Sequence, residues 1–450
     1  MKLYIKKIRL YSKAFPLERL AGLFLLFFLP LLANAQEAWT LERCIDTALE
    51  NNRNVKQQNL AKEAREIAYE QARQDLLPNL NATVGQSFGF GRTEVGYNQT
   101  ENTNSRNTSF RVSSGITLFD GLRMKYNIDA KKADMYASEA DLKKMKEDIV
   151  LSVSTAFLQV LMNKELLQLS EEQLVLTHES IKQRKAMVES GRMAEGELYE
   201  LQAQEAKEEL SRIQADNALK LSLLDLAQIL ELEDFKNMDV VVPQHLMNAE
   251  LSLLSPESVY GNALTNRPEV KSSEYKLESS EKNVDIARSA YYPTLTFGAS
   301  IGTDYFYSSA TKTNNSFDKQ LSNNLGSSVG LTLSVPIFNK FENKNRVRSA
   351  QLEVENSKLE MENTKIALRK TIQQVYQTAL AAQVRWEAAE KSEKSAQEAF
   401  RFASQKYDAG RATQYELFQA KNNLAQVLSE KTQSKYEYVF RSMILEIYNR

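Results

Sequence analysis

The segment ITLFDGLR at residues 116–123 closes an alternating stretch and leads into a long charged, Ala-rich run. A second segment of the same character, VPIFNKFE at residues 335–342, stands in the same setting later in the chain. Phe119 and Phe338 hold equivalent places in the two segments, about half of the chain apart. A repeat of this size is too long for a solenoid unit of about 20–50 residues. The sequence therefore predicts two structurally equivalent halves, each with its own strand-to-helix transition.

Each transition is preceded by two segments with the character of β-strands. In the first half, residues 80–94 are rich in Gly, Thr and Phe, and residues 108–119 alternate between apolar and polar. In the second half, residues 295–301 and 329–337 alternate in the same way. A period of two is typical of a strand with one apolar face. We expect hairpins over 80–119 and 295–338, with polar loops at 95–107 and 308–325.

A long helix is predicted after each hairpin. Residues 122–188 contain no Gly or Pro, and a helix of this length extends about 100 Å, at about 1.5 Å per residue. Apolar residues occupy every seventh position along one line of this segment, which is typical of a coiled-coil seam. The members of this line are Val153, Val160, Leu167, Leu174, Ile181 and Val188.

The second half repeats the same order of elements. In each half, the shorter helical segments before the hairpin and after the turn together match the long helix in length, so they can lie end to end beside it. The first repeat is expected over 36–240, with the long helix at 122–188, a turn at 189–194 and a helix at 195–232. A linker at 241–254 leads to the second repeat over 255–450, with the long helix at 341–407, a turn at 408–412 and a helix at 413–447.

The N-terminus has the organisation of a secretory signal peptide. Basic residues between Lys2 and Arg19 precede an apolar run from Ala21 to Leu32, and Ala33-Asn34-Ala35 follows. That order is typical of a cleaved signal, and the apolar run is shorter than the roughly 20 residues that a membrane-spanning helix needs. We expect residues 1–35 to be removed. Gln36 would then be first, so no lipid-anchored cysteine is expected.

Composition excludes several classes of protein. The formal net charge is −1, and no stripe of Lys and Arg interleaved with aromatic residues suggests nucleic-acid binding. Cys44 is the single cysteine and the chain has only two histidines, which excludes an internal disulfide and the usual zinc clusters. No phosphate-binding Gly-Lys-Ser/Thr loop is present, and no cofactor is expected. Beyond the leader no run of 18 apolar residues occurs, so any membrane-spanning part must consist of strands.

Four strands are too few to close a membrane barrel, because the smallest such barrels use about eight. An open sheet would expose unpaired backbone edges to lipid, which is not tolerated. The strands therefore predict a barrel shared between several copies of the chain. Three copies would supply twelve strands.

These features resemble the TolC-like outer-membrane efflux protein family, also called outer membrane factors. The resemblance covers residues 40–448. Its most specific parts are the two helix turns, Gly191-Arg192 with Glu197-Leu198-Tyr199 and YDAGRATQYELFQA at 407–420. LFDGLR, IFNKFE and the Leu-Pro-x-Leu junction at 77–80 also match.

The resemblance implies a mainly helical homotrimer with an internal two-fold repeat. Its twelve-stranded outer-membrane barrel, with four strands per chain, would continue into a periplasmic α-helical coiled-coil barrel. Such a protein is a passive exit duct of a tripartite efflux or type I secretion system, and it is not an enzyme. Its expected partners are a periplasmic adaptor, an inner-membrane pump of the RND, ABC or MFS type, and outer-membrane lipid.

The resemblance also places a constricted periplasmic mouth near the helix turns. The matching positions are Glu416 and Gln419 in the second repeat and Glu197 and Glu200 in the first; the second acidic position of the family is an amide in Gln419. Carboxylates around a narrow pore would favour cations and respond to pH and divalent ions. The alternative is that Thr413-x-x-Glu416 is a capping box and that the first-repeat glutamates are ordinary solvated helix residues.

Gly191, Arg192, Gly410 and Arg411 mark the two turns. Glycine supplies the positive φ needed after a helix C-terminus, and the resemblance implies that an adaptor docks on these turns. Phe119, Phe338, Tyr291 and Tyr292 are candidates for the lower aromatic belt of the barrel, with ordinary packing at the transition as the alternative.

Two other interpretations compete with the duct. A periplasmic coiled-coil scaffold would have the same helices, with a small soluble sheet in place of the barrel. An esterase is suggested by Gly85-Gln86-Ser87-Phe88-Gly89, which matches the G-x-S-x-G motif. That motif needs a helix after the serine, whereas the strand pattern continues here, and only His178 and His245 are available as a base.

Overall fold

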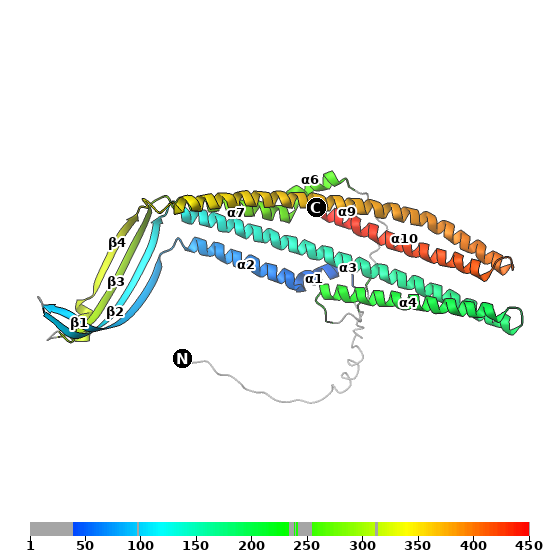
Figure 1. The fold of residues 1–450 in the computed structure, drawn as a ribbon, viewed down its shortest axis with the longest axis horizontal. Helices are drawn as coiled ribbons and strands as arrows, with labels where there is room; N and C mark the ends of the chain where they lie inside the picture. Colours follow the sequence, from blue (N-terminus) through cyan, green and yellow to red (C-terminus); the bar gives the residue numbers. More distant parts are fainter. Residues whose placement is uncertain are drawn as a thin grey trace, which may run out of the picture.

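The computed structural model describes residues 39–96, 99–233, 238, 240–241, 254–310 and 314–449. The predicted leader at 1–35 and most of the predicted linker at 241–254 lie outside these residues. The described chain is long and narrow. A sheet stands at one end, and the helices run from it to two helix turns at the other end (Figure 1).

The sheet is antiparallel and joins the two halves of the chain. It has the order β1-β2-β3-β4. The hairpin β1–β2 belongs to the first half and the hairpin β3–β4 to the second, and β2 pairs with β3 along their length, for example Val112 with Ile301. The halves therefore share one sheet. The strands are β1 (Asn79–Gly96), β2 (Gln99–Phe119), β3 (Thr294–Ser308) and β4 (Gly326–Ser334).

The first hairpin extends farther than expected. The predicted loop at 95–107 is largely strand, and Arg92 pairs with Asn102 and Phe90 with Asn104. Strand pairing uses backbone groups, so polar side chains on both faces do not prevent it.

The return strand of the second hairpin, β4, ends earlier than predicted. β4 ends at Ser334, so Val335 and Ile337, predicted as strand residues, lie beyond it. Pro336 between them has no N–H to give to a ladder. The predicted loop at 308–325 also contains a short helix, α8 (Phe317–Asn323).

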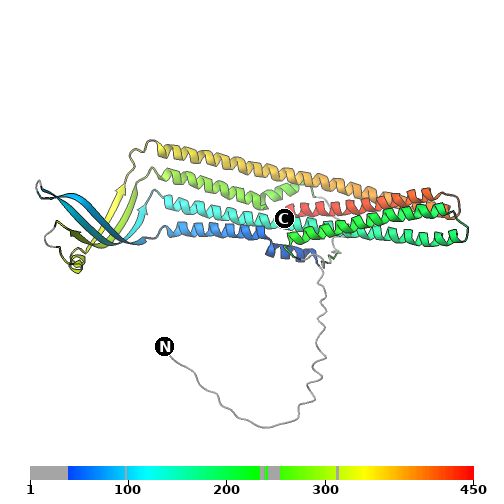
Figure 2. The same ribbon diagram turned by 60° about the horizontal axis from the view of Figure 1, so that its bottom comes forward.

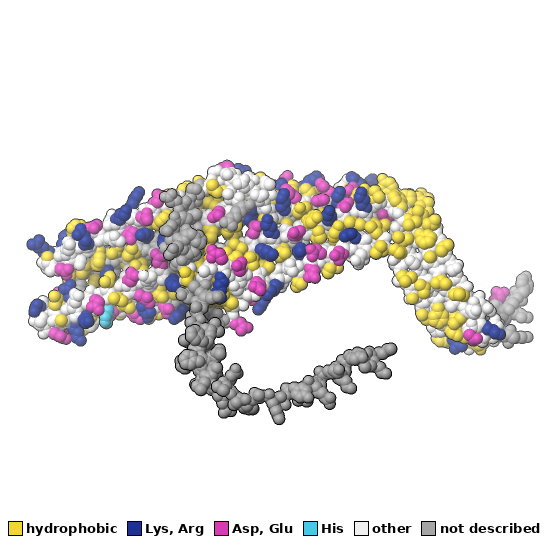
Figure 3. Space-filling model, turned by 180° about the vertical axis from the view of Figure 1, so that it is seen from behind, with side chains coloured by type: hydrophobic (Ala, Val, Ile, Leu, Met, Phe, Trp, Pro, Cys, Tyr) yellow, Lys and Arg dark blue, Asp and Glu magenta, His cyan; other side chains and the backbone are white. Residues whose placement is uncertain are grey.

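The two faces of the sheet differ in chemistry. Pairing places the apolar residues on one face, and several of them are largely exposed, such as Val329 at 77%. Apolar side chains gather over the sheet, whereas charged side chains are spread along the helices (Figure 3). The apolar face consists mainly of Leu80, Val84, Phe110, Val112, Ile116, Leu118, Leu295, Phe297, Ile301, Val329, Leu331 and Leu333. An exposed apolar surface of this kind marks a contact with lipid or protein.

Two helices of 67 residues each set the length of the molecule. In each half two shorter helices lie end to end along the long one (Figure 2). α7 also packs against α3, which joins the halves a second time. In the first half the helices are α1 (Leu41–Asn51), α2 (Arg53–Gln74), α3 (Arg123–Glu189) and α4 (Glu195–Ile229). In the second they are α6 (Pro256–Asn266), α7 (Pro268–Ser289), α9 (Glu342–Asp408) and α10 (Gln414–Asn449).

The main core lies near the middle of the helices, where α1, α3, α4 and α10 meet. Val153 and Val160 of the heptad line are fully buried there with Phe157. The later members of that line, from Leu167 to Val188, are half-buried. Cys44 is also fully buried, and burial raises the pKa of its thiol to about 12.

The core explains one property of α3. Among the described helices, α3 has the one stretch long and apolar enough to cross a membrane, and 44% of that stretch is buried. Its apolar side chains include Phe157 and Leu161, which pack inside the helical core. The composition of α3 therefore reflects helix packing.

The strand-to-helix transitions share an unusual backbone. Gly121 and Leu122 have φ of 70° and 68°, and Lys340 and Phe341 have φ of 54° and 64°. Two successive left-handed residues thus turn each strand into its long helix. In the first half Asp120, which is buried, accepts a hydrogen bond from the N–H of Met124 at 3.2 Å. The similar segments ITLFDGLR and VPIFNKFE encode the same turn.

Replacement of Gly121 by Ala tests this turn. A Cβ at Gly121 would lie 2.7 Å from the carbonyl oxygen of Ser289 and 2.7 Å from the Cβ of Tyr292. At Gly191 φ is equally positive, but a Cβ would meet nothing within 4 Å. We expect Gly121→Ala to lower the free energy of unfolding by about 3 kcal/mol or more, and Gly191→Ala by about 1 kcal/mol. Thermal unfolding in detergent, followed by circular dichroism, measures both; equal losses would contradict the packing argument.

Candidate functional site at the helix turns

Both helix turns close with the same hydrogen bonds. The N–H of Gly191 donates to the carbonyl of Val188 at 2.9 Å, and the N–H of Arg192 donates to that of Met187 at 2.9 Å. Gly410 and Arg411 repeat this pattern with Tyr407 and Lys406 at 2.9 and 2.8 Å. This is the Schellman arrangement, in which a glycine of positive φ ends a helix. The glycines therefore have a structural role, and Arg192 and Arg411 stand exposed at the turns.

A side-chain contact ties the two turns together. The hydroxyl of Tyr407 in α9 donates to the carboxylate of Glu197 in α4 at 3.0 Å. The side-chain amide of Gln414 in α10 donates to the backbone carbonyl of Glu197 at 3.0 Å. Glu197 is thus more than a solvated helix residue, because it connects the first repeat with the second.

Arg184 completes this contact from α3. Its guanidinium lies 4.7 Å from the centre of the Tyr407 ring and 3.5 Å from the carboxylate of Asp408. Burial raises the pKa of the Tyr407 hydroxyl, and the bond to Glu197 raises it further, against the opposing effect of Arg184. The hydroxyl therefore remains a donor at neutral pH.

Glu416 forms the predicted capping box. The N–H of Thr413 donates to its carboxylate at 2.8 Å, and the N–H of Glu416 donates to the Thr413 hydroxyl at 3.2 Å. The carboxylate is thus held at the first turn of α10 while the residue stays exposed. Gln419 and Glu200 are exposed on α10 and α4. Of the four positions predicted at the mouth, Glu197 is the one with a described hydrogen bond to the other repeat.

Sequence reasoning missed a buried ion pair near the turns. Lys421 of α10 lies 2.8 Å from Glu208 of α4, with side chains only 13% and 8% exposed. Thr177 of α3 donates to Glu208 at 2.5 Å and also contacts the ammonium group of Lys421. Gln204 donates to the other oxygen of Glu208 at 2.9 Å. α3 and α4 of the first repeat meet α10 of the second here. No local pattern in the sequence predicts this contact.

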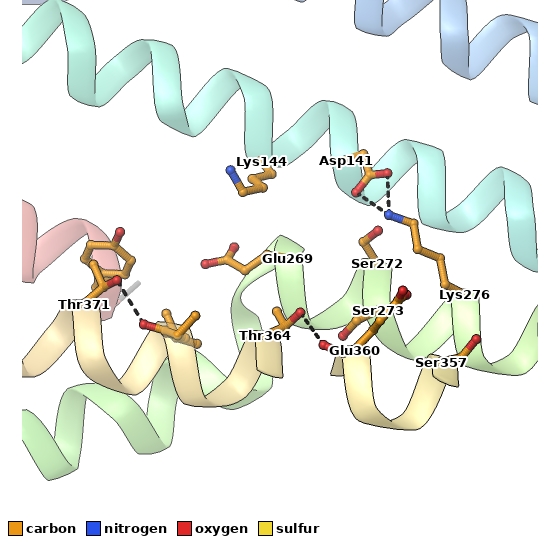
Figure 4. A pocket seen from close by; sticks show the side chains of 13 residues that line it. Asp141, Lys144, Glu269, Ser272, Ser273, Lys276, Ser357, Glu360, Thr364 and Thr371 are labelled. Atoms are coloured by element: carbon orange, nitrogen blue, oxygen red, sulfur yellow. Dashed lines mark hydrogen bonds and ion pairs between the residues drawn. The ribbon is translucent and has the colours of Figure 1, made fainter. Parts of the chain in front are cut away.

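A polar cavity of about 490 Å³ lies between α3, α7 and α9, farther from the helix turns. Asp141 and Lys276 form an ion pair at 3.0 Å across it (Figure 4). Ser272 is buried at its wall, and its hydroxyl has no hydrogen-bond partner. Acidic, basic and hydroxyl side chains line it together. Among the described residues no group of three or more His, Cys, Asp or Glu is placed to hold a metal ion.

The G-x-S-x-G match at 85–89 does not form a nucleophile elbow. Ser87 pairs with Asn107 inside the β1–β2 ladder, and the strand continues past it. A nucleophile elbow needs a helix at that point. His178 contacts Glu205 on the helices, at 3.0 Å, and His245 lies outside the described residues.

Comparison with known proteins identifies the family. The model of the outer membrane efflux protein family matches residues 44–231 and 259–443. The chain belongs to this family. The family assignment and the outer-membrane location predicted from the sequence are thereby confirmed.

Curated relatives are about a quarter identical to the chain over the aligned residues. The probable outer membrane lipoprotein SilC of Salmonella typhimurium is 24% identical over 69% of this chain and 64% of its own length. The solvent efflux pump outer membrane protein SrpC of Pseudomonas putida is 27% identical over 70% of this chain and 64% of its own. The matches thus span just under two thirds of these two relatives.

Solved structures show the same fold. One of them is CusC, whose structures were reported for its folding and transmembrane channel formation. It superposes on this chain with a TM-score of 0.78 at 17% identity, over 91% of both chains. The outer-membrane channel OprN gives 0.75 at 18% identity, over 91% of this chain and 89% of its own. The predicted fold class, long helices with a small contribution of strands, is confirmed.

The buried ion pair near the turns is testable by removing one partner. Lys421→Met leaves Glu208 charged, buried and without its cation, and we expect a loss of about 3 kcal/mol in the free energy of unfolding. Lys421→Met combined with Glu208→Gln should recover most of that loss. Lys358→Met breaks the exposed pair with Glu355 and should change nothing measurable. Denaturant unfolding in detergent decides; an equal loss in the single and double variants contradicts the assignment.

The contact between the turns predicts a pH effect. Tyr407→Phe should cost about 1 kcal/mol at neutral pH, the value of one hydrogen bond. Because the folded-state pKa of Tyr407 is raised, its contribution is complete below the unfolded pKa of about 10 and is lost as pH rises through the folded pKa. The gap between wild type and Tyr407→Phe should therefore close in alkali. Tyr415→Phe, at a tyrosine 71% exposed, is the control; unfolding midpoints from neutral to alkaline pH measure all three.

Proposed function

We propose that the protein is a homotrimeric outer-membrane exit duct that works as a passive conduit from the periplasm to the exterior. In this proposal it belongs to a tripartite efflux or type I secretion system. A periplasmic adaptor connects it to an inner-membrane pump of the RND, ABC or MFS type. The observation that supports it best is a sheet with one exposed apolar face and two unpaired edges, attached to helices of 67 residues.

The edges of the sheet favour closure by further copies. β1 and β4 are the outer strands, and among the described strands of one chain each has a partner on one side only. Unpaired backbone groups in lipid cost several kcal/mol each. Since β1 and β4 run in opposite directions, β4 of one copy can pair with β1 of the next as an antiparallel ladder. Three copies then give twelve strands in a closed ring.

The helices offer matching edges. α9 and α2 stand on opposite sides of the helical layer, with α7 and α3 between them (Figure 2). Along α9 exposed apolar residues recur every seventh position: Leu352 at 65%, Leu359 at 58% and Ile366 at 64%. α2 exposes Leu60 at 63% and Ile67 at 59%, also seven apart. Heptad spacing on both edges suits a coiled-coil seam between neighbouring copies.

The remaining assignments follow from this assembly. Residues 1–35 act as the export signal. In a ring of three copies, Glu416 and Gln419 with Glu197 and Glu200 surround the periplasmic mouth, and the adaptor docks on the turns at Gly191-Arg192 and Gly410-Arg411. Names such as solvent efflux pump outer membrane protein, given to relatives, support export of small molecules. The chain supplies the path, and the pump supplies the energy.

A charge placed on either face of one strand tests the barrel. Leu331 lies on the apolar face of β4, 65% exposed, and Thr332 lies on the polar face. Lys at a lipid-facing barrel position costs about 2–4 kcal/mol, so three copies of Leu331→Lys should abolish assembly. Thr332→Lys should leave it intact.

The measurements are heat-modifiable migration of the trimer from outer-membrane fractions and channel conductance in planar bilayers. Wild type and Thr332→Lys should give trimers and channels, and Leu331→Lys neither. A wild-type protein that is a monomer or filament in the periplasm would refute the duct and favour the coiled-coil scaffold.

A further inference from the structure

The polar face of the sheet is almost free of charge. Along the paired segments of the four strands this face consists of Asn, Ser, Thr and Gly, with Phe306 near its outer end. The charged residues on it, within the paired segments that the structure describes, are Arg111, Asp304 and Glu101. Glu101 pairs with Thr93 near the outer end of the hairpin, ten residues from Arg111 along β2, which is roughly 33 Å and well beyond a Debye length. In a wall of such small side chains, one arginine extends farthest from the backbone.

The neighbours of Arg111 leave its side chain unobstructed. Arg111 lies on β2, where it pairs with Thr83 of β1 on one side and with Gly302 of β3 on the other. A Cβ at Gly302 would lie 2.8 Å from the carbonyl oxygen of Phe110 and 3.5 Å from the Cβ of Arg111, so this site favours the residue without a side chain. Arg111 is exposed, and within the described chain its guanidinium has no hydrogen bond or ion pair.

A second arginine on the same strand gives a contrast. Arg106 lies on the opposite face, and its guanidinium is 5.7 Å from the ring centre of Tyr305 and 5.6 Å from that of Tyr307. It is held by aromatic side chains on the side that the apolar residues occupy. Arg111 faces the other side, without such contacts.

Resting on the trimeric duct proposed above, we propose that Arg111 forms a ring of three guanidinium groups in the barrel lumen that binds anionic cargo. Rings of charged side chains set the selectivity of pores. A guanidinium binds carboxylates and phosphates with two parallel hydrogen bonds and keeps its charge throughout the physiological pH range. The favoured class of cargo at this level is therefore compounds with carboxylate or phosphate groups.

Asp304 modulates this ring. It stands opposite Ser109, two residues farther along β3 than Gly302, which is roughly 7 Å along a strand. That is less than a Debye length of about 8 Å at physiological salt, so the carboxylates weaken the field of the guanidiniums. The aspartate side chain is much shorter, and the arginines therefore dominate near the axis.

The test uses purified trimers in planar bilayers, with sodium tripolyphosphate added on the side of the sheet as the anionic probe. Tripolyphosphate should block the wild-type current. Arg111→Gln should raise the half-blocking concentration at least tenfold and shift the reversal potential in a KCl gradient towards cation preference. Arg111→Lys should keep the block, and Asp304→Asn should strengthen it several-fold. Arg106→Gln, on the other face of the same strand, should match wild type.

Heat-modifiable migration confirms that each variant assembles before it is compared. Block that is the same in Arg111→Gln and wild type, or weakened equally by Arg106→Gln, overturns the Arg111 ring and leaves the duct standing. A wild-type protein that forms no channel overturns the duct and the ring together.

Discussion

The structure depends on one constraint, the need of every strand to find a partner for its backbone N–H and C=O groups. Within a chain this need is met by β2 and β3, which come from different halves of the sequence and make one sheet of them. Two edges are left over, on β1 and β4. Each strand is connected to a long or middle helix at one end, β1 to α2, β2 to α3, β3 to α7 and β4 to α9. The way the sheet edges are paired therefore also decides how the helices stand beside those of a neighbouring copy. Closure of the sheets into a ring and closure of the helices into a ring are therefore coupled, and neither occurs without the other.

The transition from strand to helix transmits this constraint. Both transitions use two successive left-handed residues, yet only the first has a glycine there. Gly121 is required because Ser289 and Tyr292 crowd it, whereas Lys340 holds the same backbone in the second half. The two halves thus share the backbone conformation of this turn, whereas the side chains at the turn differ. This is why the two segments look alike without being identical.

Sequence periodicity gave the parts of the fold that are local. The ends of α3 and α9 fall within one residue of the ranges expected from Gly and Pro, and the apolar strand face follows from alternation. The outer part of the first hairpin was missed, because strands with polar side chains on both faces lack that alternation. Tyr407 with Glu197, and Lys421 with Glu208, were also missed as contacts. Each pair joins residues more than two hundred positions apart, and only the meeting of the two repeats brings them together.

The capping box at Glu416 does not compete with a role at a pore. Its carboxylate is bound to the N–H of Thr413, which fixes the charge in place and keeps it in solvent, as a selective ring requires. Arg111, in the sheet at the other end of the molecule, is also exposed to solvent, because its neighbours on the polar face have small side chains. In the assembled duct, acidic groups would surround the entrance and guanidinium groups the exit, a full long helix apart. Cargo would then meet the carboxylates first and the guanidinium groups second, and the second ring would select by the charge of the cargo itself.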